Sequence, residues 1–419
     1  MATNKHNTGK SHLVKNHLFI FLVILVLETL PTNAQLDFKY DSILYKTLYP
    51  SHLREFLNEY PEAVIFDVRS PGEFADTSMF KSLNIGHIKG AINMPIDSIQ
   101  KSISKITQLR NKPVIVYCSH SSRSRRACKL LSENGFTQIE NLNGGMYWMS
   151  QAEEANFPGK KDFVVSSLPF TNVSVYEGVK LIRESNQLVI LDVRTKEEYK
   201  AIDTSEFLNL GHIKNSLNIP FDELKNKLSQ LLPYKNDNIL VYDHHGVFSN
   251  RASMLLHENG FTKVNNMIGG ISAVYEKIKS NIRKEILDNQ PAYSLLTAVE
   301  SYELIQSKMK LVILDLRPVD EYTNAAKETW KNRGKIRNAK NISTDNFLTE
   351  ISQLNLSKDS NLLLYGNGDQ VKYCKYLTEN GFKNVNFLFG GIYSLIYTYA
   401  NIEGYRNVKS VLDNYSGLY

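Results

Sequence analysis

Cys118 is followed, after four small or polar residues, by Arg123 in the sequence CSHSSRS (118–124). The apolar run PVIVY before the cysteine is typical of a buried strand, and the residues after it are typical of a helix. A loop that enters a helix directs backbone N–H groups inward, binds anions and stabilises a thiolate. Arg123, Arg125 and Arg126 add positive charge at the start of that helix. The pattern predicts a cysteine nucleophile beside a site for a small anion.

Three copies of one unit follow one another along the chain. The segment VIFDVRSPGEF (64–74) returns as VILDVRTKEEY (189–199) and as VILDLRPVDEY (312–322), and later motifs return in the same order. The third copy has lost two residues between Tyr365 and Gly381, the region that corresponds to the cysteine loop. Repeats of this kind predict three domains with one fold.

Within each copy, short apolar runs alternate with helical patterns. The expected elements of the first copy are strands at 63–68, 113–117 and 137–142 and helices at 71–75, at 123–134 and from Gly144 onward. Strands that alternate with helices predict an α/β fold, in which a parallel sheet carries helices on both faces. The expected domain boundaries are 35–158, 159–285 and 286–419.

The second and third copies serve as internal controls for the cysteine loop. In the second copy Asp243 stands in place of Cys118, and Phe248 stands in place of Arg123. In the third copy Gly366 takes the cysteine position, and the loop is two residues shorter. Nucleophile and arginine are lost together, so we expect the first domain to be catalytic and the other two to be inactive.

Residues that all three copies share are expected to be structural. Asp67 and Arg69 recur in each copy and are interpreted as a charge pair at a strand end, and Glu73 is set aside for the same reason. The features interpreted as unique to the first copy are Cys118, His120, Arg123 and a second serine in the loop.

The N-terminus has the pattern of a targeting segment. Lys5, Lys10 and Lys15 precede the apolar run LFIFLVILVL (18–27), and Ala34 follows as a small residue for cleavage. Ten apolar residues are too few for a bilayer, which needs about 20. We expect a signal peptide over residues 1–34 and a periplasmic or extracellular protein, with an uncleaved tether as the alternative.

Composition excludes several classes of function. The formal charge of +6 is spread thinly over 419 residues, which speaks against a nucleic-acid partner. Three cysteines cannot build a disulfide framework, and Cys128 and Cys374 are expected in the core. The run Asp243-His244-His245 lacks a third spaced metal ligand, so we expect no metal and no cofactor.

The repeated motifs and the loop CSHSSRS resemble the rhodanese superfamily, whose active loop has the pattern C-x-x-G-x-R-S. Ser121 replaces the glycine of that pattern. The resemblance implies that Cys118 takes the outer sulfur of thiosulfate as a persulfide, while Arg123 orients the anionic donor. A thiol, cyanide or protein acceptor then removes the sulfur. The residues expected to bind substrate are Ser119, His120, Ser121, Ser122 and Ser124.

Loop length separates two kinds of chemistry. Related phosphatases and arsenate reductases enclose five residues between cysteine and arginine, whereas four are enclosed here, which favours sulfur transfer over phosphoester hydrolysis. A different class of function also fits, a non-catalytic binding scaffold or a thiol redox sensor, because two of the three domains lack the nucleophile and an accessible thiolate is easily oxidised.

Overall fold

The computed structural model describes residues 42–154, 156–307, 309–401 and 406–415, all within one compact unit of the chain. The expected signal peptide lies outside the described residues. In the described part, no helix is long and apolar enough to cross a membrane.

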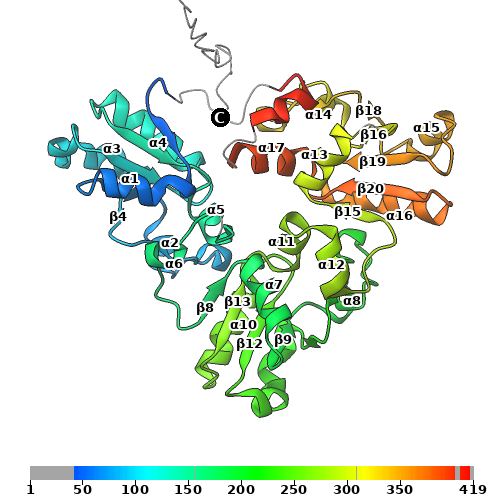
Figure 1. Cartoon of the computed structure of the whole chain (residues 1–419), viewed down its shortest axis with the longest axis horizontal. Helices are drawn as coiled ribbons and strands as arrows, with labels where there is room; N and C mark the ends of the chain where they lie inside the picture. Colours follow the sequence, from blue (N-terminus) through cyan, green and yellow to red (C-terminus); the bar gives the residue numbers. More distant parts are fainter. Residues whose placement is uncertain (1–41, 155, 308, 402–405, 416–419) are drawn as a thin grey trace, which may run out of the picture. The chain divides into compact units, whose positions relative to one another are not determined.

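Each repeat is built on a five-stranded parallel sheet (Figure 1). In the first repeat the strands lie in the order β1 (Lys46–Leu48), β6 (Ile139–Leu142), β5 (Val114–Tyr117), β2 (Val64–Asp67) and β4 (Ile92–Asn93). In the second repeat the order is β11 (Leu217–Asn218), β9 (Leu188–Asp192), β12 (Asn238–Tyr242), β13 (Val264–Met267) and β8 (Thr171–Val173). In the third repeat it is β15 (Ser294–Leu296), β20 (Asn384–Leu388), β19 (Asn361–Tyr365), β16 (Leu311–Asp315) and β18 (Lys340–Asn341). The α/β fold with parallel sheets is confirmed.

Helices connect the parallel strands. The first repeat has α1 (Leu53–Glu59), α2 (Pro71–Phe74), α3 (Ile96–Ser102), α4 (Ser122–Glu133), α5 (Gly145–Gln151) and α6 (Lys160–Phe163). The second has α7 (Val175–Glu184), α8 (Lys196–Tyr199), α9 (Phe221–Leu224), α10 (Phe248–Glu258), α11 (Gly270–Lys277) and α12 (Ser280–Ile286). The third has α13 (Ala298–Gln306), α14 (Val319–Tyr322), α15 (Phe347–Gln353), α16 (Lys372–Glu379) and α17 (Gly391–Asn401).

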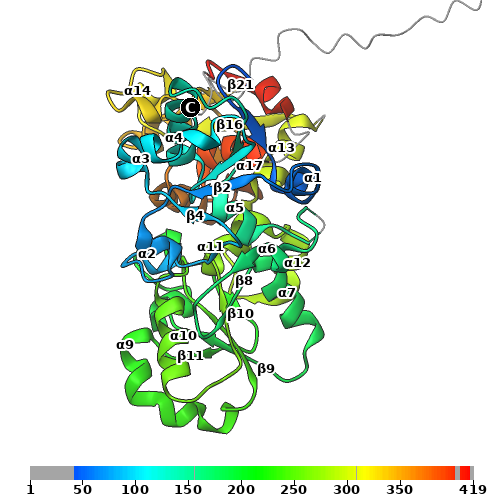
Figure 2. The same cartoon turned by 90° about the vertical axis from the view of Figure 1, so that its left-hand side faces the viewer.

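Alternate residues of the central strand β5 feed two cores. Val114 and Val116 pack in one cluster with residues of α3 and α4, whereas Ile115 and Tyr117 pack in another with residues of α1 and α5. The helices therefore cover both faces of the sheet, and Figure 2 shows α4 and α1 on either side of β2. Burial on both faces explains why β5 is apolar throughout.

A short antiparallel strand pair closes each repeat. The three pairs are β3 (His87–Ile88) with β7 (Val164–Val165), β10 (His212–Ile213) with β14 (Leu287–Asp288) and β17 (Lys335–Ile336) with β21 (Leu412–Asp413). Both β7 and β14 lie just after the expected domain ends at 158 and 285, so the segments that follow those positions complete the preceding repeat.

A buried ion pair lies at the end of β2, β9 and β16, the second sheet strand along the chain in each repeat. Arg69 Nη2 lies 2.6 Å from Asp67 Oδ2, and both side chains are fully buried. The same guanidinium donates to the carbonyl of Gly86, which ties the strand end to the next turn. Because Asp192–Arg194 and Asp315–Arg317 repeat this arrangement, the structural interpretation of the pair is confirmed.

We expect Asp192→Ala to lower the free energy of unfolding by about 3–5 kcal/mol, because it leaves the buried Arg194 without its carboxylate. Urea unfolding measures this change. Asp359→Ala, which breaks an exposed pair with Lys383, is the control and should leave the unfolding midpoint unchanged. Equal midpoints for Asp192→Ala and the wild type would contradict the expectation.

Candidate active site

Cys118 directly follows β5 and is only 1% exposed. The first amides of α5 hold the loop from behind: Met146 N donates to the carbonyl of Cys118 at 2.9 Å, and Tyr147 N donates to that of Ser119 at 3.0 Å. A Cβ on Gly145 would lie 2.1 Å from the Cys118 carbonyl oxygen, and its φ is +57°. Only glycine fits there, which explains the second glycine of the pair Gly144-Gly145, a pair that recurs at 269–270 and 390–391.

Ser121 occupies the position where the family pattern has glycine, and its φ of 71° lies in the left-handed region. This conformation costs a residue with a side chain about 1–2 kcal/mol. The hydroxyl offsets the cost, since it accepts a hydrogen bond from Gly144 N at 2.6 Å and lies 3.4 Å from the carbonyl of Leu142. The serine therefore keeps the turn that glycine would make, and its side chain points away from the inside of the loop.

Arg123 is held in a fixed position beside the thiol. Its Nη1 and Nη2 each donate to a carboxylate oxygen of Glu73 at 2.6 Å, and Nη2 also donates to Ser119 Oγ at 2.9 Å. Its pKa is raised, chiefly by Glu73, with a smaller contribution from Cys118. The bidentate pair fixes the plane of the guanidinium next to the cysteine.

Glu73 has two roles at this site. It closes the capping box of α2 with Ser70, whose N–H donates to it at 3.0 Å, and it pairs with Arg123. Burial alone would raise the pKa of Glu73, but the hydrogen bonds from Arg123 and Ser70 outweigh burial and lower it to about 2. The carboxylate therefore stays ionised across the physiological range.

The matching glutamates of the second and third repeats behave in the opposite way. Burial raises the pKa of both Glu198 and Glu321, and neither faces an arginine at the position of Arg123. The interpretation of Glu73 as purely structural is thus incomplete. Its capping role is shared with Glu198, but its ion pair belongs to the first repeat, and Arg123 itself was the signal that could have revealed it.

The other two arginines do not reach the loop interior as expected. Arg125 is buried and turns towards the sheet, where its Nη2 donates to Asn143 Oδ1 at 2.8 Å and its Nη1 to Thr47 Oγ1 at 3.4 Å. Arg126 is exposed. The expected cluster of three cations is therefore reduced to Arg123, because Arg125 is bonded to the sheet and Arg126 is exposed to solvent.

The loop serines differ in what they can contact. Ser119 supports Arg123, and Ser122 is exposed at the first position of α4. Ser124 is fully buried, and its hydroxyl donates to Asn141 Oδ1 at 2.6 Å, so its side chain is engaged with the core and not with the inside of the loop. Of Ser121 and Ser124, only the backbone amides are left to face a ligand.

His120 lies at the rim of the loop. Its ring stacks on Tyr147 with 4.8 Å between centroids, and Tyr397 of the third repeat lies 6.5 Å away. Burial, helped by the charge of Arg123, lowers the pKa of His120 to about 4, so the imidazole is neutral at pH 7. His245 stands at the matching position of the second repeat, so His120 is not unique to the first copy as the sequence analysis held.

The second repeat reveals what such a loop binds. The Asp243 carboxylate, at the cysteine position, accepts hydrogen bonds from the amides of Gly246, Phe248 and Ser249, the second at 2.6 Å and the third at 3.3 Å. Three backbone donors thus converge on this carboxyl group and oppose the burial that raises its pKa. The aligned amides in the first repeat belong to Ser121, Arg123 and Ser124, in a loop of the same length.

In the third repeat a different side chain fills the shortened loop. Gln370 in the 3-10 helix η8 (Gly368–Val371) places its Oε1 where a Cβ on Gly366 would be, and this oxygen accepts from Asn367 N at 2.7 Å. The carboxamide Nε2 donates to the carbonyl of Leu316 at 2.5 Å. The loops of the second and third repeats therefore each hold one of their own side chains in the place of a ligand.

The other two cysteines are part of the core. Cys128 and Cys374 are free and buried, and burial raises the pKa of both thiols. Among the described residues, no group of three or more His, Cys, Asp or Glu side chains is placed to hold a metal ion.

The low pKa of His120 predicts a pH-dependent loss of stability. The unfolded chain protonates His120 near 6.5 and the folded chain only near 4, so stability should fall as the pH drops through this window. We expect the midpoint temperature of thermal unfolding to fall less for His120→Gln than for the wild type when the pH is lowered from 7 to 5. Equal losses in both proteins would show that His120 protonates as readily in the folded state as in the unfolded one.

Comparison with known proteins places the three repeats in one family. A model of the rhodanese-like domain matches residues 50–152, 171–277 and 297–396. The chain is 38% identical over 109 residues to the protein YqhL of Bacillus subtilis, covering 26% of this chain and 75% of the relative. It is 33% identical over 89 residues to the thiosulfate sulfurtransferase PspE of Escherichia coli K12, covering 21% of this chain and 77% of the relative.

Other relatives have a different named activity. The tRNA uridine(34) hydroxylase of Citrobacter koseri is 26% identical over 112 residues, which cover 25% of this chain and 29% of the relative. The chain thus spans less than a third of that enzyme. The family match, by contrast, covers well over half of this chain and falls on each of its three sheets. This chain belongs to the rhodanese-like family and carries three rhodanese-like domains in tandem.

Proposed function

We propose that the chain is an exported sulfurtransferase, which moves sulfane sulfur from thiosulfate or a persulfide to a thiophilic acceptor through a persulfide on Cys118. Membership of the rhodanese-like family supports this proposal, as does the similarity to a relative named thiosulfate sulfurtransferase. The basic and apolar N-terminal segment supports export to the periplasm or the extracellular space.

One observation carries the catalytic part of the proposal. The loop of the second repeat gathers three amides on the Asp243 carboxylate, and the first repeat puts Cys118 at that position in a loop of equal length. A ring of donors around this position is suited to stabilise negative charge on a sulfur that is being transferred. Arg123 adds a fixed positive charge next to it.

The reaction proceeds in two balanced steps. In the first, the Cys118 thiolate attacks the outer sulfur of thiosulfate, a new S–S bond forms, the old one breaks, and sulfite leaves with the electron pair. In the second, a nucleophilic acceptor attacks the outer sulfur of the persulfide, and the electron pair of the broken bond returns to Cys118. Arg123 binds the anionic donor, and the loop amides stabilise the charge on the transferred sulfur.

Cys118→Ala should abolish sulfur transfer from thiosulfate to cyanide, because the chain then has no nucleophile at the loop. Intact-mass measurement after thiosulfate treatment should show the addition of one sulfur atom to the wild type and to the control Cys374→Ala, but not to Cys118→Ala. Activity that survives in Cys118→Ala would refute the proposal. Sulfenic acid or a mixed disulfide on Cys118 without persulfide would indicate a redox sensor instead.

Glu73→Gln should reduce kcat/KM for thiosulfate by about tenfold, because Arg123 loses the bidentate pair that orients it. Glutamine can still accept the hydrogen bond from Ser70 that caps α2. The matched control is Glu198→Gln, which alters the same capping box in the second repeat and should leave kcat/KM within twofold. Similar losses in the two variants would point to an effect on folding and contradict a role in orienting Arg123.

A further inference from the structure

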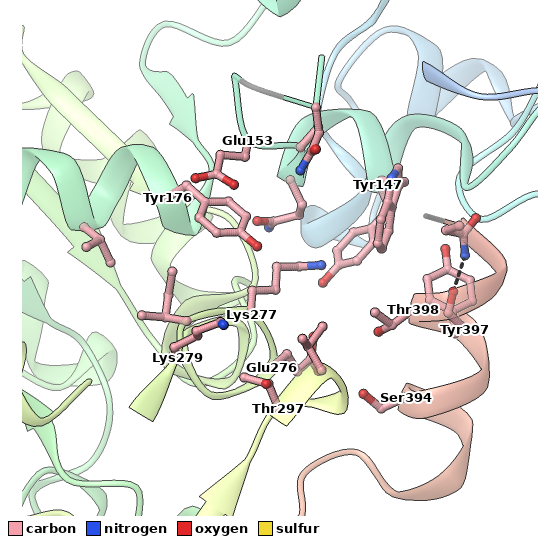
Figure 3. A pocket seen from close by; sticks show the side chains of 18 of the residues that line it. Tyr147, Glu153, Tyr176, Glu276, Lys277, Lys279, Thr297, Ser394, Tyr397 and Thr398 are labelled. Carbon is pink, nitrogen blue, oxygen red and sulfur yellow. Dashed lines mark hydrogen bonds between the residues drawn. The ribbon is translucent and has the colours of Figure 1, made fainter. Parts of the chain in front are cut away.

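A cavity of about 1270 Å³ opens between α5, α11 and α17, the helices that begin at the second glycine of the Gly-Gly pair in each repeat (Figure 3). The catalytic loop reaches this cavity, because His120 forms part of its wall. Pockets of roughly 300–1000 Å³ hold drug-sized ligands. The cavity is therefore much larger than a sulfur oxyanion such as thiosulfate requires.

Aligned positions of all three repeats line the cavity. Two neighbouring residues from each repeat face it, and these are Gln151 and Ala152, Glu276 and Lys277, and Tyr397 and Thr398. Only the second repeat places charged side chains at these positions. The inactive repeats thus build walls of a chamber that the loop of the active repeat shares.

Lys277 is the cation at the centre of this chamber. Its ammonium lies 4.7 Å from the centre of the Trp148 ring and 6.0 Å from that of Tyr147, and Figure 3 shows it extending towards Tyr147. Burial lowers the pKa of Lys277 against the opposing effect of the Glu276 carboxylate, and burial raises the pKa of Glu276. The Glu276 carboxylate therefore offsets only part of the cost of burying the positive charge of Lys277 in the cavity.

The other lysine and arginine side chains of the lining are paired with carboxylates. Their ion pairs are Lys180–Glu184 at 4.0 Å, Arg183–Glu285 at 3.3 Å and Lys279–Glu303 at 3.5 Å. Within the described residues, Lys277 has no carboxylate within ion-pair distance. A cation that is partly desolvated and flanked by two aromatic rings is suited to receive an anionic group from a ligand.

Tyr147 connects Lys277 to the catalytic loop. The same ring that lies beside the ammonium stacks on His120, and the backbone N–H of Tyr147 holds the carbonyl of Ser119. One aromatic side chain thus separates the cation of the second repeat from the loop that contains Cys118. A molecule that places an anionic group on Lys277 lies along Tyr147 and extends towards His120.

We propose that this cavity binds the sulfur acceptor of the Cys118 site, and that the acceptor is a small thiol with a carboxylate that pairs with Lys277. The inference rests on the proposed function and adds to it the class of acceptor and the residue that selects it. The volume of the cavity admits a molecule of the size of a tripeptide, and its aromatic walls suit the uncharged part of such a ligand.

The transfer step balances without a further reactant. The acceptor thiol gives its proton to the outer sulfur of the Cys118 persulfide, and the resulting thiolate attacks that sulfur, so that a sulfur–sulfur bond forms between them. The bond between that sulfur and Cys118 Sγ breaks, and its electron pair stays on Cys118 as a thiolate. The acceptor leaves as a persulfide with the proton, and Lys277 takes part only by holding the carboxylate.

Binding can be measured apart from catalysis with S-methylglutathione, which carries carboxylates but no free thiol. Isothermal titration calorimetry on the full chain should give a Kd that rises at least tenfold in Lys277→Gln and in Lys277→Met. The matched control Lys263→Gln removes an exposed lysine of the same repeat outside the cavity and should leave the Kd unchanged. Cys118→Ala should also bind as the wild type does. No binding to the wild type, or equal Kd values for Lys277→Gln and the wild type, would overturn the inference.

Kinetics separate this inference from the proposed function. With thiosulfate as donor, Lys277→Gln should lower kcat/KM for glutathione about tenfold and leave kcat/KM for cyanide and for cysteamine, a thiol without a carboxylate, within twofold. If the wild type shows no transfer to cyanide, the proposed function itself fails. If cyanide transfer is normal and Lys277→Gln treats glutathione as the wild type does, only the inference fails. If Lys277→Gln raises the KM for thiosulfate in the cyanide assay, Lys277 binds the donor and not the acceptor. That result would also overturn the inference.

Discussion

The hydrogen bonds from the start of α5 to the carbonyls of Cys118 and Ser119 determine the shape of the active loop. With these carbonyls turned towards α5, the following amides are available to face inward. The second repeat has the same arrangement, in which Ile271 N donates to the carbonyl of Asp243 at 2.9 Å. The contact requires close approach of two backbones, and this is why glycine recurs at the helix start in each repeat.

The same helix joins the loop to the cavity. Residues near the start of α5 hold the loop, while Tyr147, Trp148 and Gln151 line the space shared with the other repeats. Gln151 also reaches the second repeat, where its side chain donates to the carbonyl of Ile268 at 2.7 Å. The position of the loop therefore depends on contacts between repeats as well as within the first one. This gives the second and third repeats a physical role that requires no chemistry of their own.

Much of the fold could be predicted from the sequence, because its signals are local. The apolar runs became β2, β5 and β6, and the segment after the cysteine became α4. The direction of a side chain depends on tertiary contacts, and here prediction was weaker. Nothing in the residue order tells that Arg125 turns to Asn143 while Arg123 turns to Glu73. The sequence shows that the third repeat lacks two residues in this loop. It does not show that the side chain of Gln370 fills the space beside Gly366.

The residues of the cavity were missed for a similar reason. Lys277 belongs to a repeat without the nucleophile, and sequence reasoning looked for function only where the cysteine was kept. Its place beside Trp148 depends on how repeats pack, which the spacing within one repeat does not encode. The sequence did offer one signal: Lys277 is charged, whereas the aligned residues of the other repeats are Ala152 and Thr398.

The filled loops of the second and third repeats have a consequence for how the molecule meets its donor. Asp243 and Gln370 act as permanent internal ligands, so two of the three loops are closed to an incoming oxyanion. Although the chain has three related domains, the proposed donor should therefore bind with a stoichiometry of one per polypeptide. Its saturation curve would then be a simple hyperbola, without the cooperativity that three communicating sites could produce.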